Sequence, residues 1–232
     1  MGRAALVREL GDFLQDPQSR RGWSLAAQDG CISTAGLLLG FAGAGVSQGT
    51  LLVAGTAAIV AGALTAGGAK WAEAAAERDA QLRAVATERH ELRHQRDTER
   101  AELAEHYEDK GLSPSLADRV ARQLMVRAPL RAGLEAEHGV TQLLSPAVAA
   151  CAGVTSALAY ALGAICPFVI AYYLPVDIEI WVIVLAVLIT LTLTSTIGAR
   201  AGQMDIRRTL LRSLAVGGTT IVISYLVGQL AF

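Results

Sequence analysis

The chain has 232 residues, and 53% of them are hydrophobic. With a mean hydropathy of +0.40, it is too apolar for an ordinary soluble domain. The net charge of −1 shows that acids balance the arginines, so we expect no nucleic-acid partner. All 20 Lys and Arg fall in three blocks, residues 3–21, 70–131 and 200–212, which leaves long uncharged or acidic segments between them.

The polar N-terminal segment, residues 1–22, has neither the apolar core nor the cleavage site of a signal peptide. Leu6, Leu10, Phe13 and Leu14 share one side of a helix here, which favours an amphipathic segment on the cytoplasmic membrane surface. A simple polar tail is the alternative.

The three cysteines are odd in number and form no C-x-x-C pair, so we expect no disulfide framework.

Five apolar segments are long enough to cross about 30 Å of hydrocarbon as helices. Two of these spans, residues 23–46 and 50–69, make up a first membrane region, 23–69. The other three, residues 143–174, 180–197 and 214–232, lie in a second membrane region, 141–232. Pro167 and Pro175 are expected to interrupt or cap the third span, and Asp177 and Glu179 to mark the opposite surface.

With five spans, every Lys and Arg falls on one side of the membrane, as the positive-inside rule requires. The N-terminus and residues 70–140 are therefore expected in the cytoplasm, and the C-terminus outside. The preference for Arg over Lys is typical of a GC-rich bacterial genome, which suggests a bacterial inner (plasma) membrane.

The polar stretch 70–140 is rich in strong helix formers. No proline separates it from the second span, so that helix should continue into it, with a possible break between His94 and Thr98. Lys110-Gly111 predicts a helix end, and Ser113-Pro114 predicts a new start. A helix to Arg127 and a last short helix ending near Gly139 complete an all-α polytopic membrane protein with five transmembrane helices and an inserted cytoplasmic helical domain.

Glutamates in this stretch form two pairs with the same spacing, Glu88 with Glu91 and Glu99 with Glu102. Residues three apart share a helical face, and none of Glu88, Glu91 and Glu102 has a Lys or Arg four residues later. Grouped carboxylates are hard oxygen ligands for a divalent cation, although a solvated charged helix has a similar pattern. The two pairs could face each other across a bend in the polar stretch.

Histidines could assist as ligands. His90 and His94 have the i, i+4 spacing that can chelate a transition metal, but exposed side chains on a charged helix are the favoured interpretation, and His106 and His138 are similar candidates. The chain contains no H-E-x-x-H, Walker, dinucleotide or serine-nucleophile motif. We therefore expect a protein that is not an enzyme and uses no organic cofactor.

Asp29 lies about 9 Å beyond Trp23 along the first span, at about 1.5 Å per residue. Ionisable residues at such depth usually face a cavity or a partner. Two copies facing each other across a dimer axis could bind a cation or share protons. A carboxylate stabilised by the helix N-terminus near the interface is the simpler alternative.

Short motifs in a fixed order cover residues 24 to 230, and together they resemble the vacuolar iron transporter family. They are Asp29-Gly30, Gly62-Ala63-Leu64-Thr65, the glutamate pairs with Tyr107 and Lys110-Gly111-Leu112, Gly163 to Pro167, Gly198-Ala199-Arg200, and Gly217, Tyr225 and Gly228. The resemblance implies a homodimer whose cytoplasmic domain binds divalent metal through glutamates and whose path between the two first spans exports Fe²⁺ in exchange for protons. By position, the metal ligands are Glu88, Glu91, Glu99, Glu102, Glu135 and Glu137, and Asp29 belongs to the transport path.

Two positions depart from the family pattern. Ala66 stands where the family has a methionine of the transport path, and Lys70 stands near an expected glutamate. Loss of a thioether weakens selection for softer ions, and a positive charge near the cytoplasmic mouth repels a cation. Three hypotheses follow: an Fe²⁺/proton antiporter, a transporter of the same fold for Mn²⁺ or another divalent ion such as Co²⁺ or Zn²⁺, and a membrane-anchored metal-binding or sensing module that does not transport.

Overall fold

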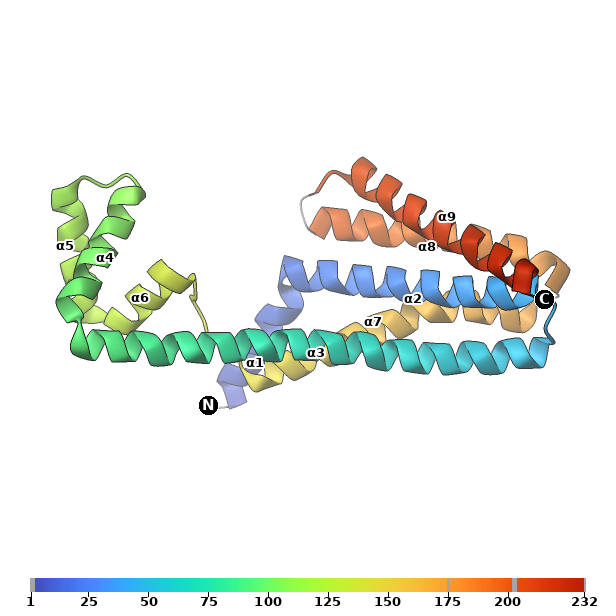
Figure 1. Ribbon diagram of the computed structural model, residues 1–232, viewed down its shortest axis with the longest axis horizontal. Helices are drawn as coiled ribbons and strands as arrows, with labels where there is room; N and C mark the ends of the chain where they lie inside the picture. Colours follow the sequence, from blue (N-terminus) through green and yellow to red (C-terminus); the bar gives the residue numbers. More distant parts are fainter. Residues whose placement is uncertain (1–2, 175, 202–203, 232) are drawn as a thin grey trace. The chain divides into compact units, whose positions relative to one another are not determined.

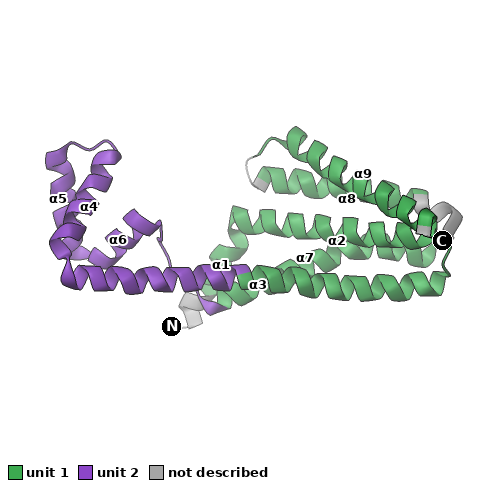
Figure 2. Cartoon of the chain, in the orientation of Figure 1, with its two compact units in different colours: residues 1–72, 147–232 green, residues 73–146 purple. Residues whose placement is uncertain are grey.

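The computed structural model describes residues 3–174, 176–201 and 204–231, and within these ranges it contains helices and no strand (Figure 1). The helices are α1 (Arg3–Gln15), α2 (Pro17–Gly43), α3 (Gln48–His94), α4 (Arg96–Asp109), α5 (Pro114–Arg127), α6 (Pro129–His138), α7 (Pro146–Tyr173), α8 (Val176–Ala201) and α9 (Ile206–Ala231). They form two compact units, residues 1–72 with 147–232, and residues 73–146 (Figure 2).

Five of the described helices, α2, α3, α7, α8 and α9, are long and apolar enough to cross a membrane. Their number and order agree with the five predicted spans. The all-α polytopic fold expected from the sequence is therefore confirmed.

The first membrane helix begins at Pro17, earlier than the expected start at Trp23. Asp16 is the N-cap residue, and its Oδ2 accepts a hydrogen bond from the backbone N–H of Ser19 at 2.8 Å. Proline at the first helical position completes a strong start signal. The N-terminal polar segment is thus divided between α1 and the first turns of α2.

Helix α3 runs without interruption from the second span through the first part of the polar stretch (Figure 1). It ends at His94, and the chain bends at Gln95, whose φ of −136° and ψ of 36° are not helical. The predicted continuous helix is confirmed, and the break that the sequence left open between His94 and Thr98 occurs at Gln95.

The interruption expected at Pro167 does not occur, because α7 continues through this proline. Proline lacks an N–H donor, but within a membrane bundle neighbouring helices can accommodate the carbonyl group that it frees. Pro167 is fully buried. Pro175 and the side chains of Asp177 and Glu179 lie outside the described part of the chain.

Small residues allow close contact between helices in the membrane unit. A Cβ atom on Gly228 of α9 would overlap the backbone carbonyl oxygen of Gly40 in α2, so the two backbones touch there. Two hydrogen bonds join α2, α8 and α9: Gln28 Nε2 donates to the buried Ser195 Oγ at 3.0 Å, and the half-buried Ser213 Oγ donates to Gln28 Oε1 at 3.3 Å.

The smaller unit has its own core, formed by the buried side chains of Leu103, Ala121, Met125 and Ala132. The carboxylate of Asp118 in α5 pairs with Arg100 of α4 at 3.9 Å. Left-handed glycines end two of the helical segments, Gly111 with a φ of +94° and Gly139 with a φ of +64°. This core fixes α4, α5 and α6 around one another.

Candidate metal centre

Glu88 is a fully buried acidic side chain, with an exposed fraction of 0%. Neither of its carboxylate oxygens has a hydrogen-bond partner. Burying an ionised carboxylate without a partner is strongly unfavourable. Glu88 must therefore be either protonated or neutralised by a cation.

Other acidic side chains surround Glu88. Three groups of residues each have ligand atoms within 4.8 Å of one another: Glu88 with Glu91 and Glu99, Glu99 with Glu102 and Glu137, and Glu88 with Glu137 and His138. Each group shares at least one member with the others. They form one continuous cluster, which we name the carboxylate cluster.

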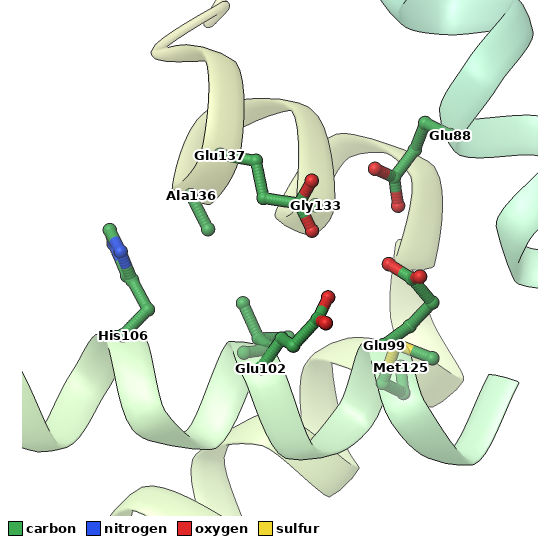
Figure 3. A pocket seen from close by; sticks show the side chains of 9 residues that line it. Glu88, Glu99, Glu102, His106, Met125, Gly133, Ala136 and Glu137 are labelled. Carbon is green, nitrogen blue, oxygen red and sulfur yellow. The ribbon is translucent and has the colours of Figure 1, made fainter. Parts of the chain in front are cut away.

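A cavity of about 40 Å³ lies at the centre of this cluster. Figure 3 shows the carboxylates of Glu88, Glu99, Glu102 and Glu137 pointing toward the same space. The lining is completed by Leu103, His106, Met125, Gly133 and Ala136. A cavity of this size can hold a small ion or water, since one water needs roughly 10–15 Å³ by this measure.

The bend at Gln95 brings the two glutamate pairs together. Glu88 and Glu91 lie in the last part of α3, and Glu99 and Glu102 lie in the first turns of α4. The backbone N–H of Glu99 donates to the Gln95 carbonyl at 3.1 Å, which starts α4 directly after the bend. Glu99, Glu102 and His106 then share one face because they are three and four residues apart.

Helix α6 closes the cavity with Gly133 and Glu137, which lie four residues apart on one face. A Cβ atom on Gly133 would lie 2.7 Å from Glu88 Oε2 and would overlap Oε1. The Glu88 carboxylate therefore occupies the space that any other residue would fill at position 133.

Burial and neighbouring negative charges make the two most deeply placed carboxyl groups weak acids. Burial, followed by the charges of Glu137 and Glu99, raises the pKa of Glu88 to about 7. Burial and then Glu137 raise the pKa of Glu99 to about 7 as well. A bound divalent cation would act in the opposite direction and favour the ionised forms.

The structure distributes the six predicted metal ligands unequally. Glu88 and Glu99 are buried, Glu91 is half-buried, and Glu102 and Glu137 are exposed at the rim. The remaining one, Glu135, is exposed and belongs to no ligand group among the described residues. Five of the six side chains are thus brought together.

Four residues that line the cavity are not singled out by the sequence analysis: Leu103, Met125, Gly133 and Ala136. Gly133 carried a usable signal, because a glycine inside a helix often marks a close approach. Leu103, Met125 and Ala136 carried none, since apolar residues at helical spacing are equally expected in a core. Among the candidate histidines, His106 lines the cavity, and His138 joins a ligand group although its side chain is exposed. His90 and His94 are exposed, belong to no ligand group among the described residues, and stack on each other at 4.3 Å between ring centroids.

The predicted residues of the transport path lie in the membrane unit. Asp29 is exposed on the surface of the single chain, and its Oδ1 accepts a hydrogen bond from Ser33 Oγ at 3.2 Å. The neighbouring Gly30 packs directly against the backbone of Tyr160 in α7. Ala66 is half-buried, and its carbonyl accepts a hydrogen bond from Ser156 Oγ at 3.4 Å.

These features define a polytopic α-helical membrane protein that carries a carboxylate-lined cavity in a helical insertion between its second and third spans. The model of the VIT family matches residues 21–229. The chain therefore belongs to the VIT family, as the sequence motifs predicted.

Two curated relatives have similar sequences. One is a protein from Acanthamoeba castellanii named vacuolar iron transporter, which is 29% identical over 211 residues, covering 89% of this chain and 76% of that protein. The other is vacuolar iron transporter 1 from Tulipa gesneriana, which is 29% identical over 153 residues, covering 65% of this chain and 62% of that protein.

Replacing Gly133 with alanine tests how the Glu88 carboxylate is positioned. In Gly133→Ala the new methyl group should displace the end of a flexible side chain rather than backbone, so the fold should survive. We expect divalent-metal affinity to fall by about tenfold, equivalent to about 1.4 kcal/mol, measured by isothermal titration of the purified full-length protein with Mn²⁺.

A second substitution serves as the control. Adding Glu88→Asp shortens the side chain and withdraws its carboxylate from position 133, so Gly133→Ala/Glu88→Asp should bind Mn²⁺ more tightly than Gly133→Ala alone. Equal Mn²⁺ affinity of Gly133→Ala and the wild type would show that the space left by Gly133 does not position the Glu88 carboxylate for metal binding.

The raised pKa values of Glu88 and Glu99 predict how stability depends on pH. The folded metal-free protein binds more protons than the unfolded chain between the ordinary Glu pKa of 4.5 and the folded pKa of about 7. The contribution of these two carboxyl groups to the stability of the protein should therefore be largest below about pH 4.5 and should be lost as the pH rises through 7. Thermal unfolding of the metal-free protein in detergent between pH 5 and 8 measures this fall.

The double variant Glu88→Gln/Glu99→Gln is the matched control, because amides do not titrate. Its unfolding temperature should change less between pH 5 and 8 than that of the wild type. The same pH dependence in both proteins would mean that these two carboxyl groups do not control it.

Proposed function

We propose that this protein captures a divalent metal ion in the carboxylate cluster and carries it across the membrane, out of the cytosol and in exchange for protons. The observation that carries the proposal is Glu88, an unpartnered carboxylate with 0% exposure. It faces a small cavity lined by further carboxylates, a setting that suits a cation. Membership of the VIT family, and relatives named vacuolar iron transporters, support transport rather than simple binding.

The direction of transport is inferred from the distribution of charge. All the Lys and Arg residues lie in the N-terminal segment, in the stretch from Lys70 to Arg131, and in the loop from Arg200 to Arg212. The positive-inside rule assigns these three segments to the cytoplasm. The carboxylate cluster would then collect the ion in the cytoplasm, and a bacterial inner membrane is the setting that we propose.

A homodimer is supported by the surface position of Asp29. Asp29 and Ser33 are both exposed on the single chain although they lie in a membrane span. A carboxylate that faces lipid is costly, so a second copy that covers this face would remove the cost. Two Asp29 carboxylates would then face a shared path that can accept either a cation or protons.

Proton exchange is supported by the chemistry of the ligands. Carboxyl groups must be ionised to bind a metal ion, so capture releases protons from any group that was protonated. With the pKa values of Glu88 and Glu99 raised to about 7, capture near neutral pH should release protons.

The ion that we propose first is Fe²⁺, because the relatives are named iron transporters. Mn²⁺, Co²⁺ and Zn²⁺ are alternatives. Ala66 offers no side-chain ligand to the path, and an oxygen-rich donor set accepts Mn²⁺ readily.

A second candidate function is metal binding or sensing without transport. It is favoured by Ala66, whose backbone carbonyl accepts a hydrogen bond from Ser156, and by Lys70 near the expected cytoplasmic mouth. In this case the cluster would still bind metal, but no ion would cross the membrane.

Metal flux into proteoliposomes separates these functions. With a pH gradient imposed, we expect uptake of Fe²⁺, and of Mn²⁺ or Co²⁺, that depends on the gradient and is accompanied by counter-movement of protons, measured with a fluorescent metal indicator and a pH dye. The Asp29→Asn variant should lose most of this flux while it retains Mn²⁺ binding, because it leaves the carboxylate cluster intact.

Three other outcomes can be distinguished from this expected one. Flux of Mn²⁺ without Fe²⁺ would favour the transporter for another ion. Metal binding without any flux would leave only the sensing module. An absence of both binding and flux would contradict every function proposed here.

A further inference from the structure

A ring nitrogen of His138, a carboxylate oxygen of Glu88 and a carboxylate oxygen of Glu137 lie within 4.8 Å of one another. We propose that His138 is a nitrogen ligand of the carboxylate cluster and that it biases the cluster toward Fe²⁺, Co²⁺ and Zn²⁺ over Mg²⁺ and Ca²⁺. This inference rests on the proposed function, because it requires the cluster to bind metal.

The local structure fixes His138 beside the two glutamates. It is the last residue of α6, and Gly139 follows with a φ of +64°, which turns the chain away. The backbone N–H of Val140 then donates to the Leu134 carbonyl at 3.0 Å and completes the helix cap. Adjacent residues on a helix point about 100° apart, so Glu137 and His138 leave α6 in different directions, and each still places a ligand atom within 4.8 Å of one on Glu88.

The ring nitrogens of His138 are available for coordination. Within the described ranges, His138 makes no hydrogen bond or ion pair. The carboxylate of Glu88, which it approaches, has no hydrogen-bond partner either. An unpartnered carboxylate beside an unpartnered imidazole is a donor set that a metal ion can satisfy.

The other histidines of the smaller unit are placed differently. His90, His94 and His138 are all exposed, but neither His90 nor His94 belongs to a ligand group among the described residues, and His94 Nδ1 lies 2.8 Å from the His90 carbonyl oxygen. His106 lines the cavity but belongs to none of the three ligand groups, and its ring lies edge-on to Tyr107 at 5.6 Å between centroids. His106 is therefore a close internal control for His138.

The chemical consequence concerns which ions are retained. Carboxylates alone suit Mg²⁺, Ca²⁺ and Mn²⁺, whereas imidazole favours Fe²⁺, Co²⁺ and Zn²⁺. A nitrogen donor in the cluster would therefore supply selectivity that Ala66 does not supply in the membrane. A simpler role for His138 is a favourable interaction with the helix C-terminus, and that role places no nitrogen on the metal.

Pulsed electron paramagnetic resonance of Mn²⁺ bound to the full-length protein in detergent tests the inference directly. We expect ¹⁴N modulation from a coordinated imidazole in the wild type. The modulation should disappear in His138→Gln and remain in His106→Gln. In parallel, titrations should show that His138→Gln lowers Co²⁺ affinity by about tenfold and leaves Mg²⁺ affinity unchanged.

Metal binding without ¹⁴N modulation in the wild type would overturn the inference and leave the proposed function standing. Survival of the modulation in His138→Gln together with its loss in His106→Gln would also overturn the inference and leave the proposed function standing. If the wild type binds neither Mn²⁺ nor Co²⁺, the proposed function fails together with the inference.

Discussion

The smaller unit depends on one electrostatic constraint, a carboxylate at Glu88 with 0% exposure and no hydrogen-bond partner. The group is not exposed at the surface of the chain, and the polar groups near it include other carboxylates. Mutual repulsion of this kind opposes folding unless protons or cations neutralise it. A protein that retains such an arrangement sacrifices stability in its metal-free form, which is expected of a binding site and not of a core.

The neighbouring helices bring the carboxylates together and leave room for them around the cavity. The bend at Gln95 turns the second glutamate pair toward the first, and Gly133 leaves space where the Glu88 carboxylate lies. An apolar core that includes Leu103 and Met125 holds α4, α5 and α6 in place without supplying a compensating positive charge to Glu88. The core therefore holds the helices in place, while the Glu88 carboxyl group at the cavity must be protonated or balanced by a cation.

Much of the fold could be predicted from the sequence, because membrane spans and helix ends have local signals. Apolar length predicts the spans, while Gly111, Pro114 and Gly139 mark the ends of helices in the polar stretch. The error at Pro167 has a physical cause, since a membrane helix can continue through a proline that neighbouring helices surround.

The candidate site was only partly predictable. The period of the glutamates in α3 and α4 identified four clustered side chains, but it could not choose between Glu135 and Glu137. That choice depends on the face that α6 turns toward the cavity, which Gly133 and Ala136 share with Glu137. Contacts between helices determine this orientation, and a single sequence does not reveal them.

Anomalous X-ray diffraction from crystals of the full-length protein grown with Mn²⁺ would show whether the carboxylate cluster holds a divalent cation. We expect an anomalous peak at coordination distance from Glu88 and Glu99, with at least one oxygen of Glu137 also in contact. A well-ordered cluster without such a peak, in crystals that show Mn²⁺ bound elsewhere on the chain, would contradict the proposal that the cluster holds a divalent cation.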